Sequence, residues 1–130
     1  MTRLLSAYTG TLLVMVVLDL LWLGVIAKPL YQQGIGHLMA DKPNIPVAVL
    51  FYLLFPIGLM VFVVQPDRAW SATLAAAAMY GFFTYATYDL SNLATLRGWP
   101  VSLAAIDIAW GTFISTVTGA AAKFAFDAVR

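Results

Sequence analysis

The amino-acid sequence predicts an all-α integral membrane protein, built as a four-helix bundle. The chain of 130 residues is 62% hydrophobic and only 10% charged, whereas a soluble domain typically carries about 25% charged residues. Its mean hydropathy is +0.88. Four apolar stretches approach or exceed the roughly 20 residues that a helix needs to cross the hydrocarbon core. They leave no length for a soluble domain, so we expect a single transmembrane domain over residues 1–130.

Proline, glycine and charged residues separate the four stretches, because these residues begin or end helices. Pro56 lies inside the second stretch, where we expect it to kink the helix and free a carbonyl. The length of the first apolar run, and Asp19 inside it, argue against a cleaved signal peptide. The expected spans are residues 4–27, 45–64, 70–96 and 101–126.

The basic residues predict the orientation of these spans. With four spans both termini lie on the same side, together with Arg3, Arg68, Lys123 and Arg130. The opposite side holds Lys28, Lys42 and Arg97. Since basic residues are retained in the cytoplasm, this excess of four over three predicts an N-in, C-in, multi-pass protein.

The longest connection, residues 28–44, has two interpretations. Tyr31, Ile35 and their apolar neighbours favour a short interfacial helix, and an irregular loop is the alternative. His37 is the only histidine of the chain. It is either polar surface or a group that caps the acidic residues described below and titrates near neutral pH.

Composition also limits the partners. The chain has no cysteine, which excludes disulfides and thiolate chemistry. A net charge of +1 without any basic run argues against a nucleic-acid partner. The lipid bilayer is the expected surrounding, and a homodimer or a larger membrane complex is compatible with the small size of the bundle.

Three aspartates, Asp19, Asp89 and Asp107, lie inside the apolar stretches. A charged side chain at bilayer depth costs about 2.5–3.5 kcal/mol on insertion scales. At about 1.5 Å per residue, each lies roughly 10 Å from the helix end that faces the 28–44 connection. The three carboxyl groups therefore share one layer. Because close carboxylates are not all ionised at low cost, this layer should bind a proton or a cation.

Aromatic residues accompany the aspartates at helical spacing. Asp19 and Trp22, like Asp107 and Trp110, form an Asp-x-x-Trp pair on one helix face. Tyr and Trp donate hydrogen bonds to carboxylates from rings that pack well. With Asp19 as a further ligand- or proton-binding candidate, we predict a polar-floored cavity, open to the outer side, that is lined by Trp22, Tyr85, Tyr88, Asp89, Asn92, Asp107 and Trp110.

A structural role for the same residues is the alternative. Each aspartate can join two helices through a hydrogen bond to Trp or Tyr, and Lys28 or Arg97 can fold back to neutralise one of them. At the other side of the membrane, small residues recur four apart in the first, third and fourth spans, which lets membrane helices approach closely. These are Ser6 and Gly10, Ala77 and Gly81, and Gly111, Ser115 and Gly119.

Three strings resemble a bacterial membrane-protein family known as domain of unknown function 2177. They are LDLLWLG at 18–24, YATYDLSNLATLRGWP at 85–100 and DIAWG at 107–111. The resemblance covers essentially the whole chain and implies a small four-span protein of the bacterial inner membrane. It implies no reaction, ligand or cofactor. Members are often encoded beside lipid-modifying enzymes, which favours a lipid-related role.

Three classes of function follow from the sequence. The first is binding or transport of a proton, a cation or a lipid-like ligand at the acidic layer. The second is an accessory subunit of a membrane complex, docked through lipid-facing stripes of small residues. The third is a lipid-modifying membrane enzyme, in which aspartates act as acid and base or hold a divalent metal. Catalytic residues, metal ligands and cofactors are not determined at this level.

Overall fold

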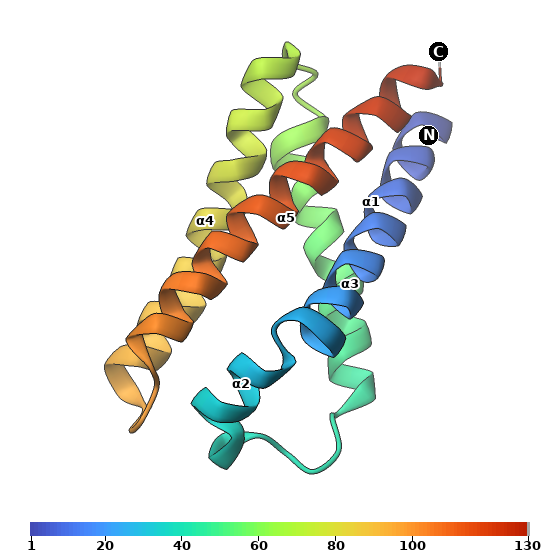
Figure 1. Cartoon of the computed structure of the whole chain (residues 1–130). Coiled ribbons are helices and arrows are strands. Elements are labelled where there is room, and N and C mark those ends of the chain that lie inside the picture. Colours follow the sequence, from blue (N-terminus) through green and yellow to red (C-terminus); the bar gives the residue numbers. More distant parts are fainter. Residues whose placement is uncertain (130) are drawn as a thin grey trace.

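The computed structural model describes residues 1–129 and confirms the all-α fold. Both termini lie at one end of the molecule, here called the terminal end, and α2 and the α4–α5 turn lie at the other, the α2 end (Figure 1). The long helices are α1 (Thr2–Leu21), α3 (Ile45–Leu59), α4 (Trp70–Thr95) and α5 (Val101–Ala128). The shorter elements are the π-helical turns η1 (Trp22–Ile26) and η3 (Met60–Val64), the helix α2 (Lys28–Ile35) and the 3₁₀ turn η2 (Gly36–Leu38).

Three segments are long and apolar enough to cross a membrane: Thr2–Ile26, Ile45–Val64 and Val101–Ala128. The remaining expected span, residues 70–96, corresponds to α4, which has 26 residues but is rich in hydroxyl side chains. Thr84, Thr87 and Thr95 donate hydrogen bonds to backbone carbonyls four residues earlier, at 2.6–2.8 Å. Such bonds satisfy hydroxyl groups inside the helix itself.

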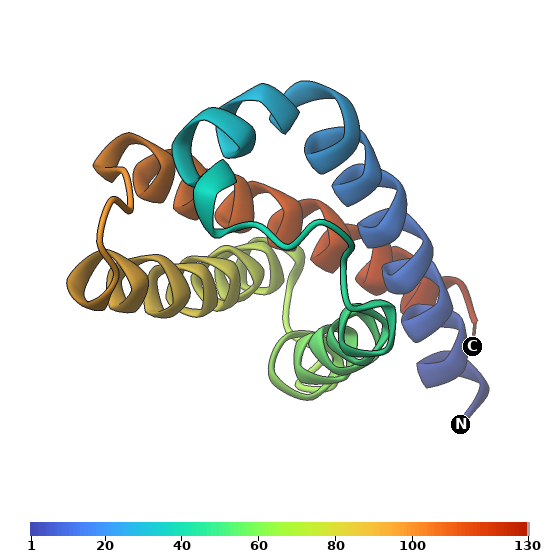
Figure 2. The same ribbon diagram turned by 90° about the horizontal axis from the view of Figure 1, so that it is seen from below.

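Helix α5 is the central element, because it makes the most extensive contacts with both α4 and α1. In Figure 2, α5 (orange to red) lies between α4 (yellow) and α1 (blue), and α3 (green) lies to one side and is seen nearly end-on. Small residues form the close contacts. A Cβ atom added at Gly81 would collide with the Gly111 carbonyl and the Ser115 side chain, and one at Gly119 would lie 2.6 Å from the Ala77 Cβ atom.

The small-residue stripes therefore lie inside the bundle and do not face lipid. Gly10 completes the pattern, since a Cβ atom there would lie 3.5 Å from the Cβ atom of Ala125 on α5. The expectation of lipid-facing stripes is wrong for a simple reason. A stripe of small residues marks a close helix contact but does not say which helix provides the partner surface.

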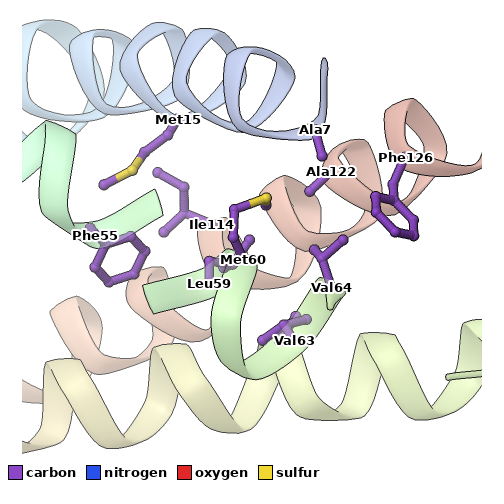
Figure 3. Packing of buried hydrophobic residues seen from close by; sticks show 11 residues of the cluster. Ala7, Met15, Phe55, Leu59, Met60, Val63, Val64, Ile114, Ala122 and Phe126 are labelled. Carbon is purple, nitrogen blue, oxygen red and sulfur yellow. The ribbon is translucent and has the colours of Figure 1, made fainter. Parts of the chain in front are cut away.

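The hydrophobic core lies among α1, α3, η3 and α5 (Figure 3). Met15 of α1, Leu59 of α3 and Ile114 of α5 are fully buried there. Val63 and Val64 of η3 extend this core toward the terminal end. Because lipid is as apolar as these side chains, they stabilise the bundle through close van der Waals packing and not through removal from water.

Pro56 interrupts the hydrogen-bond ladder of α3, and tyrosines from other helices bind the carbonyls beside it. The Tyr8 hydroxyl of α1 donates to the Leu53 carbonyl oxygen at 3.0 Å. The Tyr80 hydroxyl of α4 donates to the Phe55 carbonyl oxygen at 3.1 Å. These bonds fix α3 between α1 and α4, close to the point where it passes into η3.

The 28–44 connection begins with a helix, α2, whose first turn contains Pro29. Ile35 of α2 is buried in a second apolar cluster with Trp99 and Leu103. His37 follows in η2, and its ring lies near Gly98 of the α4–α5 turn, which has a φ of +72°. This histidine therefore packs on a turn and does not cap the aspartates.

All ion pairs of the described residues lie at the terminal end. The Lys123 ammonium is 3.5 Å from Asp67 and 3.3 Å from Asp127. The Arg3 guanidinium is 3.9 Å from Asp127 and lies over the Phe126 ring at 3.8 Å from its centre. These cations thus tie the ends of α1 and α5 to each other and to the η3–α4 connection, far from the α2 end.

We predict that Gly81→Ala destabilises the protein by about 1–3 kcal/mol, because the new methyl group forces α4 away from α5. Gly24→Ala is the matched control, since a Cβ atom there meets nothing within 4 Å. Equilibrium unfolding in mixed micelles measures both. Equal stability of the two variants would mean that the α4–α5 contact is looser than described.

Candidate functional site: an acidic, aromatic cavity

A cavity of about 430 Å³ lies at the α2 end of the bundle. Its volume falls in the range of roughly 300–1,000 Å³ that is usual for small-molecule sites. Residues of α1, η1, α2, α3, α4 and α5 enclose it. They are Asp19, Trp22, Leu23, Tyr31, Ala48, Phe51, Tyr52, Phe55, Thr84, Tyr85, Tyr88, Asp107 and Trp110.

Asp19 lies near the end of α1, on the face that meets α3 and α5, and its side chain is 4% exposed. One carboxylate oxygen accepts a hydrogen bond from the Tyr52 hydroxyl at 3.0 Å. The other accepts one from the Trp110 indole nitrogen at 3.1 Å. Two neutral donors thus hold this carboxylate at the cavity wall.

Asp107 lies in the second turn of α5 and is 5% exposed. Its carboxylate accepts a hydrogen bond from the Tyr31 hydroxyl of α2. The Tyr31 oxygen in turn accepts a hydrogen bond from the Trp22 indole nitrogen at 3.4 Å. Burial, followed by the bond to Asp107, raises the pKa of Tyr31, so that this hydroxyl remains a neutral donor at physiological pH.

The Trp22 and Trp110 rings join these two sets of contacts. Their centres are 4.4 Å apart, and their planes differ by only 3°. Trp22 belongs to η1, the π-helical turn that follows Asp19 in the chain. The two Asp-x-x-Trp pairs therefore meet across the α1–α5 interface and form one connected network with Tyr31 and Tyr52.

Asp89 occupies a different position from the other two aspartates. It is 0% exposed, it does not line the cavity, and neither carboxylate oxygen has a hydrogen-bond partner. Its charged neighbour is Asp107. Asp89 therefore lies behind Asp107, in the interface between α4 and α5.

The remaining predicted site residues lie on or near α4. The Tyr85 ring lies against Gly111 and lines the cavity. Tyr88 also lines the cavity, and its ring packs edge-on against Trp99 with the ring centres 5.8 Å apart. Asn92 is half-buried and lies outside the cavity lining. The structure thus brings six of the eight candidates into one lining and leaves Asp89 and Asn92 out of it.

Several lining residues were not predicted. Tyr52 and Phe51 are in the second span, which carries no charge and no periodic polar face to distinguish one side. Tyr31 was assigned only to an interfacial connection, although it bonds directly to Asp107. Tyr52 carries the only hydroxyl group of the second span, and this is the signal that would have found it.

No lysine, arginine or histidine of residues 1–129 forms an ion pair with Asp19, Asp89 or Asp107. Lys28 and Arg97 are exposed and do not neutralise these carboxyl groups. Within the same residues, no group of three or more His, Cys, Asp or Glu side chains is placed to hold a metal ion. The polar groups around the cavity are therefore carboxylates, which accept hydrogen bonds, and hydroxyl and indole groups, which donate them.

These features define a helical membrane protein with an acidic, aromatic cavity at one end. The chain belongs to the family described as "Predicted membrane protein (DUF2177)", whose model matches residues 4–124. This match confirms the expected family, which has no established function. Comparisons with curated proteins and with solved structures find no match.

We predict that Tyr52→Phe and Asp19→Asn are coupled in a double-mutant cycle by about 0.6–1.7 kcal/mol, the range of hydrogen bonds between membrane helices. Tyr8→Phe is the matched control, because the Tyr8 hydroxyl donates to the Leu53 carbonyl oxygen and not to Asp19. Its cycle with Asp19→Asn should be additive. Unfolding free energies in mixed micelles give the coupling, and additive effects for Tyr52 as well would contradict this contact.

Proposed function

We propose that this protein binds an amphiphilic organic cation, an ammonium group on an apolar body, in the cavity at the α2 end. One observation carries the proposal. Asp19 and Asp107 face the same largely apolar cavity, and no cationic side chain of residues 1–129 neutralises either of them. A ligand cation would supply the missing charge.

The cavity wall suits such a ligand chemically. Stacked Trp22 and Trp110 offer aromatic faces, and cations gain about 0.5–2 kcal/mol over such faces, more when water is excluded. The carboxylates already accept hydrogen bonds from neutral donors, which orient them without cancelling their charge. The apolar part of the ligand would pack against Phe51 and Phe55.

The side of the cavity favours a ligand that partitions into lipid. Leu23 and Phe51 line the cavity and are 46% and 43% exposed on the outside of the bundle. In a spanning protein, such apolar surface contacts hydrocarbon. An amine-bearing lipid headgroup and a free hydrophobic cation share this chemistry, and the experiment below separates them.

The other two classes of function have less support. The accessory-subunit proposal relied on small residues facing lipid, and these residues pack inside the bundle instead. A lipid-modifying enzyme would use the aspartates as acid and base. No described contact, however, favours a reaction over simple binding.

We also propose that the protein crosses the bacterial inner membrane four times, with both termini in the cytoplasm. In addition to the three apolar segments, α4 crosses the membrane in this proposal, and its threonine hydroxyls are satisfied within the helix. Its close packing against α5 along its length supports the same depth in the bilayer. Transport of the ligand, as opposed to binding alone, and assembly into a homodimer are further expectations of this proposal.

The topology is testable with single introduced cysteines, because the natural chain contains no cysteine that would also be labelled. In intact cells, a membrane-impermeant maleimide should label Asp41→Cys and Arg97→Cys, but it should label Gln65→Cys only after permeabilisation. Labelling of Asp41→Cys without Arg97→Cys would contradict the spanning role of α4. The reverse pattern at all three positions would invert the orientation.

The ligand class is testable with a defined probe. We expect benzyltrimethylammonium to bind the reconstituted protein and quench its tryptophan fluorescence, and benzylsulfonate, an anion of similar size, not to bind. Asp107→Asn should weaken binding about tenfold or more, which equals about 1.4 kcal/mol. Asp41→Asn, an exposed carboxylate in the 28–44 connection, is the matched control and should bind normally.

The lipid composition of the vesicles distinguishes the two sources of the cation. Protein in vesicles of phosphatidylglycerol alone should bind the probe more tightly than protein in vesicles with phosphatidylethanolamine if an amine headgroup is the natural occupant. Equal binding in both favours a free cation. Binding of the anion, or no loss of cation binding in Asp107→Asn, would contradict the proposal.

A further inference from the structure

Asp89 is a buried carboxyl group that cation binding in the cavity does not explain. It is completely buried between α4 and α5, and both of its oxygens lack a hydrogen-bond donor. An ionised carboxylate without donors in such a place is costly, because burial removes the water that would stabilise it. By comparison, the Asp19 carboxylate has two hydrogen-bond donors.

The titratable groups that act on Asp89 are few. Asp107 faces it from α5, and the hydroxyl groups of Tyr31 on α2 and Tyr88 on α4 lie within electrostatic reach. No group of α1 or α3 belongs to this set, and no cation of the described chain does. The environment of Asp89 is therefore one carboxylate and two neutral phenols.

We propose that Asp89 and Asp107 hold one proton between them, and that a cation entering the cavity displaces this proton into water. The second half of this inference rests on the proposed function, and the first half does not. A proton bound between two neighbouring carboxyl groups gives Asp89 the partner that it otherwise lacks. The pair then carries a single negative charge.

Charge balance gives the reason for the exchange. With the proton bound, Asp89 and Asp107 together carry one negative charge. When a ligand cation binds beside Asp107, the proton leaves through the cavity and both carboxyl groups become ionised. One positive charge enters and one leaves, so the net charge of the buried site does not change. Because the two events compete, the protein would exchange protons for organic cations.

The first test measures proton release and binding together. Benzyltrimethylammonium is added to the reconstituted full-length protein in weakly buffered solution with a pH indicator. We expect up to one proton to be released per bound cation, and binding to weaken as the pH falls, by up to tenfold per pH unit. Asp89→Asn should still bind the cation, but without proton release and with an affinity independent of pH.

Asp41→Asn, in the exposed connection, is the control and should release protons as the wild type does. Binding without proton release in the wild type, or undiminished release in Asp89→Asn, would overturn the exchange. If Asp89→Asn does not fold, the pH dependence of cation affinity in the wild type decides the same question. A flat affinity overturns the inference, and a sloping one supports it.

An infrared measurement tests the shared proton without any ligand. The wild type at neutral pH should show the carbonyl stretch of a protonated carboxyl group, which Asp89→Asn should lack and which Asp41→Asn should retain. Absence of this band overturns the inference whatever the binding result. A band that is present while no cation binds supports the shared proton and contradicts only the proposed function.

Discussion

The close approach of α5 to α4 and α1 is the constraint on which the rest of the structure depends. Gly81 and Gly111 bring α4 and α5 together at the level of the backbone, and Gly10 of α1 faces Ala125 of α5 at ordinary van der Waals distance. Two aspartates and two tryptophans on α1, η1 and α5 are thereby brought into one network. A larger side chain at Gly81 would push α4 away from α5, whereas an added methyl group at Gly10 would make only ordinary van der Waals contact with Ala125.

The two ends of the bundle differ in how their acidic side chains are paired. At the terminal end, Arg3 and Lys123 pair with acidic residues and tie α1, α5 and the η3–α4 connection together. At the α2 end, the carboxyl groups have only neutral donors, and Asp89 has none. Stable membrane proteins usually neutralise buried charge, so an arrangement that leaves it unpaired is better explained by a mobile partner, a proton or a ligand cation.

The positions of the three aspartates suggest two different roles. Asp19 and Asp107 face the cavity and would contact a ligand directly, whereas Asp89 lies behind Asp107 and would adjust its charge. Exchange of a proton for a cation requires only Asp89 beside Asp107 and a route by which the proton reaches the cavity through Asp107. A bundle of this size has room for such a site but not for the broken helices that larger transporters use.

The sequence by itself determined the class of protein, the four long helices, the shared depth of the aspartates and the two Asp-x-x-Trp pairs. These follow from local rules, since hydropathy, helix-breaking residues and the helical repeat depend only on neighbours in the chain. The tertiary structure decided which helices the small residues join, that Tyr31 and Tyr52 complete the cavity, and that Asp89 and Asn92 lie outside it. Helix rotation and partner choice set these features. An apolar span such as α3 carries no polar face that would reveal them, because lipid and neighbouring helices accept the same side chains.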